Sequence, residues 1–273
     1  MLSFPNAKIN LGLNIVRKRA DGFHDLETVF YPVTGLRDAL ETVHGNTGDG
    51  TLNFTHTGLE IAGDTAHNLS CKAYHLLKKD FPELPAIQMH LHKVIPMGAG
   101  LGGGSADGAF ALNMLNQQFG LGLSEQQLIN YALILGSDCP FFIINKACYA
   151  TGRGEKLEHS SVDLSSYQLV LINPGIHVPT GWAFSQIQPT TPAHHCKAIV
   201  QQPVETWRDT LTNDFEAPVM KAYPEMQAIK EQLYQQHAVY AAMTGTGSTI
   251  YGIFSKNDVP SFNFPSHYFI YRG

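Results

Sequence analysis

The chain has 273 residues, of which 44% are hydrophobic and 15% are charged. At roughly 150 residues per domain, this length predicts one or two domains, and the hydrophobic content excludes a disordered or fibrous protein. The 18 Lys and Arg against 23 Asp and Glu give a formal net charge of −5, which excludes a broad basic surface for nucleic acid or another polyanion.

Strand signals open the chain. Apolar and polar residues alternate over 8–15, and a turn at 21–24 leads to a second expected strand over 27–33. Residues 35–66 predict short strands broken by glycine, with a loop at 45–50. Asn68 then predicts the cap of a helix that runs to about residue 79, and a strand is expected at 87–91.

The middle of the chain holds a glycine-rich segment, 96–105, followed by a helix that Gly120 ends. Ser124 and Gln127 predict the capping box of a further helix, which Gly136 stops, and the apolar run 141–144 predicts a strand. Later strands are expected at 168–172, 239–243 and 250–254, with helices near 206–215 and 225–237 and a glycine turn at 244–247. These elements predict an α+β fold in two domains, 1–155 and 156–273.

The cysteines and the N-terminal segment indicate the compartment. The four cysteines form no C-x-x-C pair, which predicts reduced, mostly buried thiols; they are Cys71, Cys139, Cys148 and Cys196. The first residues do not resemble an export signal, and no window approaches the roughly 20 apolar residues needed to span a bilayer. We therefore expect a cytoplasmic protein with no membrane partner.

Five glycines lie between the strand at 87–91 and the following helix, at positions 98, 100, 102, 103 and 104. Because glycine has no Cβ, the backbone N–H groups of such a segment can approach an anion closely. The helix N-terminus adds about half a positive charge and unpaired N–H donors. The segment therefore predicts a phosphate site that needs no lysine, since a bare strand-to-helix turn requires fewer glycines.

Other glycine motifs fit this segment less well. No Lys follows the glycines, as a Walker loop requires. Gly98, Gly100 and Gly103 do match the G-x-G-x-x-G pattern of dinucleotide-binding proteins, with Glu125 near the spacing of a ribose-binding acid. Glu125, however, falls in the first turn of a capped helix and not at the end of a second strand. A nucleophile elbow is excluded because Asp107 stands where glycine is required.

The segment from Pro96 to Ser105 resembles the phosphate loop of the small-molecule kinases that include galactokinase, homoserine kinase and mevalonate kinase. Two more motifs of that family occur in order, at 5–11 and 244–248. The segments 19–24, 135–142 and 173–180 are similar to those members that phosphorylate the 2-hydroxyl of 4-diphosphocytidyl-2-C-methyl-D-erythritol in non-mevalonate isoprenoid synthesis. The resemblance implies a two-domain small-molecule kinase fold with a ferredoxin-like C-terminal half and the active site between the halves. It also implies ATP as phosphoryl donor and Mg²⁺.

The resemblance assigns catalytic roles to two residues. Asp138 matches the base that deprotonates the substrate hydroxyl, and Lys8 matches the residue that keeps this carboxylate ionised. Without the resemblance, Asp138 would be interpreted as a cap or turn residue before a strand, and Lys8 as a solvated side chain.

Substrate and nucleotide contacts follow from the same resemblance. His24 would hydrogen-bond the cytosine between the rings of Phe23 and Phe184, although these could also be turn and core residues; position 23 departs from the family's usual Tyr. Further substrate contacts would come from Asn10, Thr180, Gly245 and Thr246. The ATP contacts would be Asn68, Lys93, Pro96, Gly98, Ala99, Gly100, Leu101, Gly102, Gly103, Gly104 and Ser105, of which Asn68 could equally be a helix cap and Lys93 a solvated strand end.

No metal ligand is assigned, since Ala106 replaces the second serine that often follows the triple glycine. Water-mediated Mg²⁺ held by the triphosphate is the simplest expectation. His90, His92, His194 and His195 do not complete a zinc site and are expected on the surface.

Three alternatives to this function stay open. They are a sibling kinase acting on homoserine or mevalonate, a catalytically idle ligand-sensing homologue, and a dehydrogenase. The partners expected are ATP and the small cytidylyl substrate, with no nucleic acid, and the sequence does not predict the oligomeric state.

Overall fold

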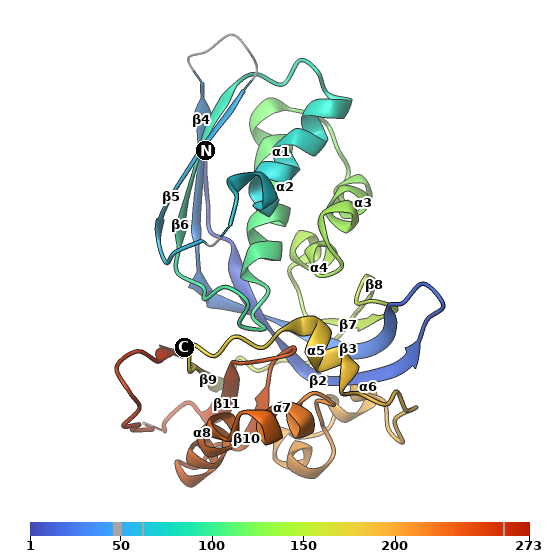
Figure 1. Ribbon diagram of the computed structural model, residues 1–273, viewed down its shortest axis with the longest axis vertical. Helices are drawn as coiled ribbons and strands as arrows, with labels where there is room; N and C mark the ends of the chain where they lie inside the picture. The colour runs from blue at the N-terminus through green and yellow to red at the C-terminus, as the bar shows by residue number, and fades with distance from the viewer. Residues whose placement is uncertain (46–50, 62, 259) are drawn as a thin grey trace. The chain divides into compact units, whose positions relative to one another are not determined.

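A computed structural model describes residues 1–45, 51–61, 63–258 and 260–273, so most of the loop predicted at 45–50 lies outside the described residues. The chain forms two compact units (Figure 1). The first comprises Met1–Ala7, Pro32–Met97 and Gly102–Lys146, and the second Lys8–Tyr31, Gly98–Leu101 and Ala147–Gly273. The units interleave along the chain because two long strands, β2 (Asn6–Lys18) and β3 (His24–Arg37), each pass from one unit into the other.

The first unit is built on a four-stranded sheet in the order β1-β4-β6-β5. Its strands are β1 (Leu2–Ser3), β4 (Ala39–His44), β5 (Leu52–Gly58) and β6 (Ile87–Lys93), and only β5 and β6 pair in parallel. Alternate residues of β6 are buried, as the sequence pattern predicts. The helices α1 (Leu69–Asp80) and α2 (Gly103–Phe119) cover one face of this sheet (Figure 1).

The helix boundaries of this unit follow from local capping chemistry. The side chain of Asn68 accepts the N–H of Ser70 at 2.9 Å, after a 3₁₀ turn at Thr65–His67. Ser124 and Gln127 form the complete capping box of α3 (Glu125–Leu135). Gly120 ends α2 in the left-handed region, at φ 61°. The three predicted caps are confirmed.

The strand predicted at 141–144 is wrong, because these residues belong to the helix α4 (Cys139–Ile144). A four-residue apolar run buried on several sides has no periodicity that separates strand from helix. Pro140 lies in the first turn, where its missing N–H costs nothing, and Asn145 ends the helix in the left-handed region.

The second unit contains an antiparallel sheet in the order β10-β11-β9-β12, with helices on one face (Figure 1). Its strands are β9 (Tyr167–Asn173), β10 (Tyr240–Met243), β11 (Ile250–Ser255) and β12 (Phe269–Arg272), and its main helices are α7 (Glu216–Ala222) and α8 (Pro224–Gln235). The core between them includes Ile172, Val219, Ile229 and Leu233, which are all nearly inaccessible to solvent. A second sheet has the order β2-β3-β7-β8, where β7 is Cys148–Thr151 and β8 is Lys156–His159. The short helices α5 (Thr180–Ser185) and α6 (Cys196–Ile199) complete the unit.

The helix predicted near 206–215 is also wrong in its extent. A 3₁₀ helix covers Val204–Asp209, and beyond it Asn213 forms an isolated parallel bridge with Leu13. The N–H of Leu13 in β2 donates to the carbonyl of Thr212 at 2.9 Å. The backbone N–H of Asp214 donates to the carbonyl of Leu13, also at 2.9 Å. Pairing with a strand distant in sequence therefore overrides the local helical pattern.

All four cysteines are buried free thiols that form no disulfide, as expected. Burial raises the pKa of the Cys71 and Cys148 thiols to about 11. Within the described residues, no helix is both long and apolar enough to cross a membrane.

Candidate active site

The last residues of the glycine motif form the N-terminus of α2, in the first unit. Gly102 occupies the cap position in the left-handed region, at φ 71°, and supplies no side-chain cap. The first N–H groups of the helix have no intrahelical partner, and the helix dipole makes this end favourable for an anion. At Gly104 a Cβ would meet no atom within 4 Å, so the space beside the first turn of the helix is open at this residue. The geometry is that of a phosphate site built from the backbone.

The preceding part of the motif, Gly98–Leu101, lies in the second unit against the turn at 244–247. Gly100 has φ +78°, and a Cβ there would lie 2.1 Å from the carbonyl oxygen of Thr244. The carbonyl of Leu101 also accepts the N–H of Lys8 at 2.9 Å. Only glycine fits at position 100, since both the backbone conformation and the close approach exclude a side chain.

Lys8 is a buried member of this arrangement and not the solvated side chain of the alternative interpretation. Its side chain lies in β2 and the residue is 3% exposed. The ammonium donates to Oδ1 of Asn10 at 2.7 Å and to the carbonyl of Gly100 at 3.1 Å. Lys8 and Asn10 are two residues apart in β2, so their side chains lie on one face of the strand, as the alternation over 8–15 predicts.

Two threonines that the sequence analysis did not assign complete the network. The hydroxyl of Thr244 accepts the N–H of Asn10 at 3.0 Å and lies 3.1 Å from both Asn10 Oδ1 and the Gly100 carbonyl. The amide nitrogen of Asn10 donates to the hydroxyl of Thr28 at 3.0 Å. Residues of all three motifs thus meet in one hydrogen-bonded network. Thr244 stands at the start of the third motif, which is the one signal that could have identified it; nothing in the sequence marks Thr28.

Asp138 lies at the start of α4 in the first unit. It occupies the cap position, but its side chain makes no capping hydrogen bond to the helix. Its neighbour Cys139 contacts the side chain of Ser105, the last residue of the glycine motif, and α4 packs against α2. The candidate base and the helix N-terminus are therefore parts of one compact unit.

The aromatic residues predicted to bind cytosine lie in the second unit. The rings of His24 and Phe184 stack with centroids 5.0 Å apart and planes inclined by 24°. The ring of Phe23 is exposed and faces the guanidinium of Arg153, 4.1 Å from its centroid. Partial burial, and secondarily the charge of Lys18, lower the pKa of His24. Thr180 is the exposed first residue of α5.

Asn68 and Lys93 each have a second interpretation, as a helix cap and as a solvated strand end, and the structure supports the second interpretation only for Asn68. The side chain of Asn68 acts as a helix cap. Lys93 is not a solvated strand end, because it is 1% exposed and is bound by the carboxylates of Asp38 and Asp107. Its last position in β6 points its side chain inward, in phase with the buried residues of that strand.

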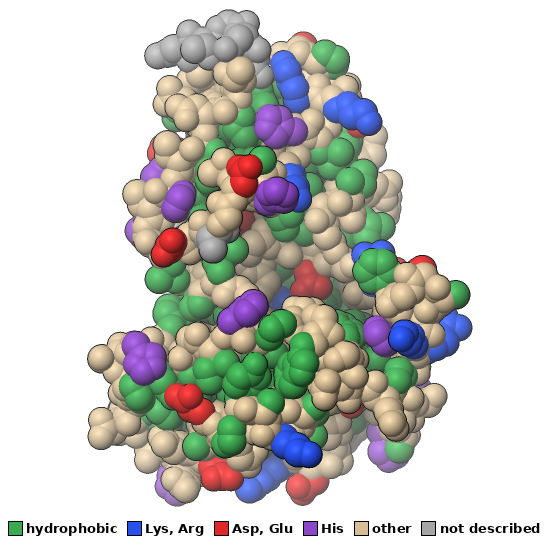
Figure 2. Space-filling view, viewed as in Figure 1, with side chains coloured by type: hydrophobic (Ala, Val, Ile, Leu, Met, Phe, Trp, Pro, Cys, Tyr) green, Lys and Arg blue, Asp and Glu red, His purple; other side chains and the backbone are tan. Residues whose placement is uncertain are grey.

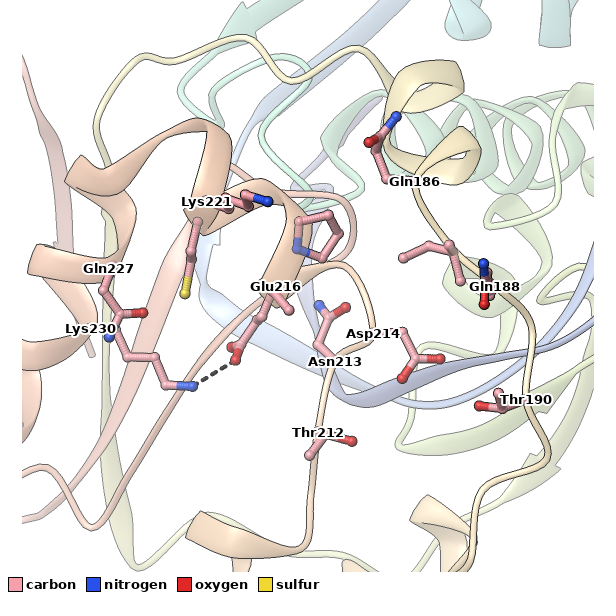
Figure 3. Close-up of a pocket in the computed structure, with 14 residues that line it drawn as sticks. Gln186, Gln188, Thr190, Thr212, Asn213, Asp214, Glu216, Lys221, Gln227 and Lys230 are labelled. Carbon is pink, nitrogen blue, oxygen red and sulfur yellow. Dashed lines mark hydrogen bonds and ion pairs between the residues drawn. The ribbon is translucent and has the colours of Figure 1, made fainter.

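A cavity of about 790 Å³ lies elsewhere in the second unit and is lined by none of the predicted site residues (Figure 3). The ion pair between Lys230 and Glu216 forms part of its wall. Asn213 at its edge donates to the carbonyl of Gly245 at 2.9 Å. Within the described residues, no group of three or more His, Cys, Asp or Glu could hold a metal ion.

The fold and the glycine loop define a small-molecule kinase, and comparison with known families agrees. The model described as "GHMP kinases N terminal domain" matches residues 68–146, and "GHMP kinases C terminal" matches residues 197–262.

Individual relatives narrow the class. The chain is 50% identical over 258 residues to the 4-diphosphocytidyl-2-C-methyl-D-erythritol kinase of Bacteroides fragilis strain YCH46, covering 94% of this chain and 93% of the relative. It is 46% identical over 274 residues to the kinase of that name from Bacteroides thetaiotaomicron, covering 100% and 99%. A crystal structure of 4-(cytidine 5'-diphospho)-2C-methyl-D-erythritol kinase matches with a TM-score of 0.80 at 29% identity, covering 93% and 90%. The chain therefore belongs to the GHMP kinases and, within them, to the family of 4-diphosphocytidyl-2-C-methyl-D-erythritol kinases.

Proposed function

We propose that the protein transfers the γ-phosphoryl group of ATP to the 2-hydroxyl of 4-diphosphocytidyl-2-C-methyl-D-erythritol, a step of non-mevalonate isoprenoid synthesis. The observation that carries this proposal is the 46–50% identity over nearly the whole chain to kinases named for that substrate. The backbone anion site at the start of α2 supports it, since a kinase must hold the phosphates of its donor.

Phosphoryl transfer requires chiefly that the acceptor be positioned and that negative charge be stabilised. We assign Asp138 as the base that takes the proton of the 2-hydroxyl as the oxygen attacks the γ-phosphorus. A positioned base contributes roughly 10²–10⁴ in rate. Lys8 would keep the carboxylate ionised, and its hydrogen bonds to Asn10 and Gly100 hold the ammonium in a fixed place.

The cytosine would be bound by His24, Phe184 and Phe23. The rings of His24 and Phe184 stack on each other, so they would offer the base an aromatic face beside a polar ring edge. Stacking on such a surface contributes roughly 1–3 kcal/mol per base. Replacement of the family's Tyr by Phe23 removes a hydroxyl and keeps the ring.

Mg²⁺ is part of the proposal, and the residues present fit an ion held mainly by the nucleotide. The described chain offers no cluster of three or more His, Cys, Asp or Glu, and Mg²⁺ commonly keeps several waters and binds through substrate phosphates. Bound with ATP, it would neutralise charge on the β- and γ-phosphates.

The decisive experiment couples ADP release to a spectroscopic signal, with Mg²⁺, ATP and the cytidylyl substrate. We expect turnover by the wild type, and we expect Asp138→Asn to abolish it while changing the Kd for ATP by no more than a few fold. Asp80→Asn, which alters an exposed acid at the end of α1, is the matched control and should retain full turnover. Near-normal turnover by Asp138→Asn would remove this residue from the mechanism.

The same assay separates the alternatives. Activity on homoserine or mevalonate without activity on the cytidylyl substrate would indicate a sibling kinase. Binding of both ligands without turnover would indicate a ligand-sensing homologue, and tight binding of NAD without binding of ATP a dehydrogenase.

A further inference from the structure

A cluster of three buried charges lies beside the glycine motif in the first unit. Lys93 at the end of β6, Asp38 just before β4 and Asp107 in α2 are each no more than 2% exposed. The ammonium of Lys93 contacts Asp38 Oδ2 and lies 2.7 Å from Asp107 Oδ2. We call these three residues the buried ion cluster.

The buried ion cluster joins the two flanks of the motif. Asp38 Oδ1 accepts the backbone N–H groups of Val94 at 2.6 Å and Ile95 at 2.8 Å, so this carboxylate holds the chain that leads into the motif. Asp107 lies beyond the motif, in the second turn of α2. The contact between Lys93 and Asp107 therefore closes a segment whose ends are 14 residues apart.

The cluster also touches the motif itself. A Cβ at Gly103 would lie 3.0 Å from the ammonium nitrogen of Lys93 and 2.9 Å from Cγ2 of Ile95. The buried ammonium therefore leaves no room for a side chain at the first residue of α2. We infer that a shift of Lys93 would move the N–H groups at the start of this helix.

Stability alone does not account for the cluster. Two carboxylates share one ammonium, and Asp107 Oδ1 is buried with no hydrogen-bond partner. Buried ion clusters are often no more stabilising than apolar side chains of equal volume, because desolvation opposes their attraction. Fixed geometry beside a functional loop gives such a cluster a role that apolar packing does not supply.

We propose that Asp38, Lys93 and Asp107 are positioning residues for ATP: they hold the flanks of the glycine motif at the separation at which the N–H groups of α2 converge on a phosphate. All three are no more than 2% exposed, so in this proposal Lys93 acts through the backbone of the motif and not through a direct contact with the nucleotide. The inference rests on the proposed function only in naming ATP as the ligand.

The test compares substitutions at Asp107 by calorimetric titration with MgATP and by steady-state kinetics. Asp107→Ala leaves the Lys93–Asp38 pair intact, so we expect a folded enzyme with the Kd and KM for ATP raised about tenfold. The KM for the cytidylyl substrate should change less than twofold. The control Asp80→Ala removes an exposed acid of the same unit and should leave both constants unchanged. An unchanged Kd for ATP in folded Asp107→Ala, or equal losses for both substrates, would overturn the proposal.

Two conservative variants keep the test decisive if Asp107→Ala unfolds. Asp107→Asn keeps the acceptor oxygen in place without its charge, whereas Asp107→Glu keeps the charge and moves it by one methylene. A positioning role predicts that Asn retains ATP affinity within about threefold and that Glu loses more. The reverse order would mean that the charge acts on the ligand directly, and would refute the proposal.

The experiments distinguish failure of the proposed function from failure of the positioning role. A wild type that binds MgATP but does not phosphorylate the cytidylyl substrate would contradict the assigned reaction, and the ATP titrations of the variants would still decide the role of the cluster.

Discussion

The hydroxyl of Thr244 illustrates how single polar atoms hold the buried lysine, Lys8. It accepts from the backbone of Asn10 and can donate to either Asn10 Oδ1 or the Gly100 carbonyl. Thr244 is fully buried, so removal of the hydroxyl would leave the N–H of Asn10 without a partner in a dry environment. Such an orphaned donor costs about 1–3 kcal/mol. The place of the Lys8 ammonium thus depends on a neighbouring hydroxyl that does not contact the ammonium itself.

A second prediction for a single residue concerns Asp107 and the pH dependence of stability. Burial, with the neighbouring charge of Asp38, raises the pKa of this carboxyl to about 7, against the opposing effect of Lys93. The folded state therefore binds this proton more tightly than the unfolded state, and the resulting stabilisation is lost as the pH rises through 7. We expect the free energy of unfolding of the wild type to fall by about 1–3 kcal/mol relative to Asp107→Asn between pH 5 and pH 8.

Urea denaturation at the two pH values measures this difference. Asp163→Asn is the matched control, because hydrogen bonds from Ser165 lower the pKa of Asp163 and leave it ionised at both pH values. The difference in the free energy of unfolding between Asp163→Asn and the wild type should be the same at both pH values. A pH-independent difference for Asp107→Asn as well would mean that Asp107 does not titrate in this range.

At the scale of elements, local chemistry was predictable and distant pairing was not. The caps at Asn68, Ser124 and Gly120 depend on residues within one turn, so the sequence displays them directly. The bridge at Asn213 depends on Leu13 in β2, almost 200 residues away, and no local pattern contains that partner. The buried ion cluster likewise joins Asp38, Lys93 and Asp107 from three elements, and charges alone suggested at most a solvated Lys93.

The glycine motif contains a matched pair of substitutions that separate folding from binding. Gly100→Ala introduces a Cβ 2.1 Å from the Thr244 carbonyl at φ +78°, so we expect stability to fall by more than about 2 kcal/mol. Gly104→Ala introduces a Cβ into open space and should leave stability within about 1 kcal/mol. Since that space is where a phosphate would approach the start of α2, Gly104→Ala should raise the Kd for MgATP at least tenfold.

Denaturation and calorimetry on both variants test this pair. Unimpaired ATP binding by Gly104→Ala would exclude the start of α2 as the phosphate site. Unchanged stability of Gly100→Ala would contradict the close packing of that glycine on Thr244.

At the scale of the whole molecule, a protein with a formal net charge of −5 is assigned a highly anionic ligand. Lys and Arg side chains stand in several separate places on the face shown in Figure 2, between acidic, apolar and histidine side chains. Attraction by exposed charges is screened within about 10 Å at 0.1 M salt, whereas hydrogen bonds from backbone N–H groups act at contact and are screened far less. We therefore expect the KM for MgATP to change less than about threefold between 50 and 300 mM KCl at constant free Mg²⁺. A loss of affinity of tenfold or more over this range would mean that exposed lysines or arginines, and not the N-terminus of α2, provide most of the binding to the triphosphate.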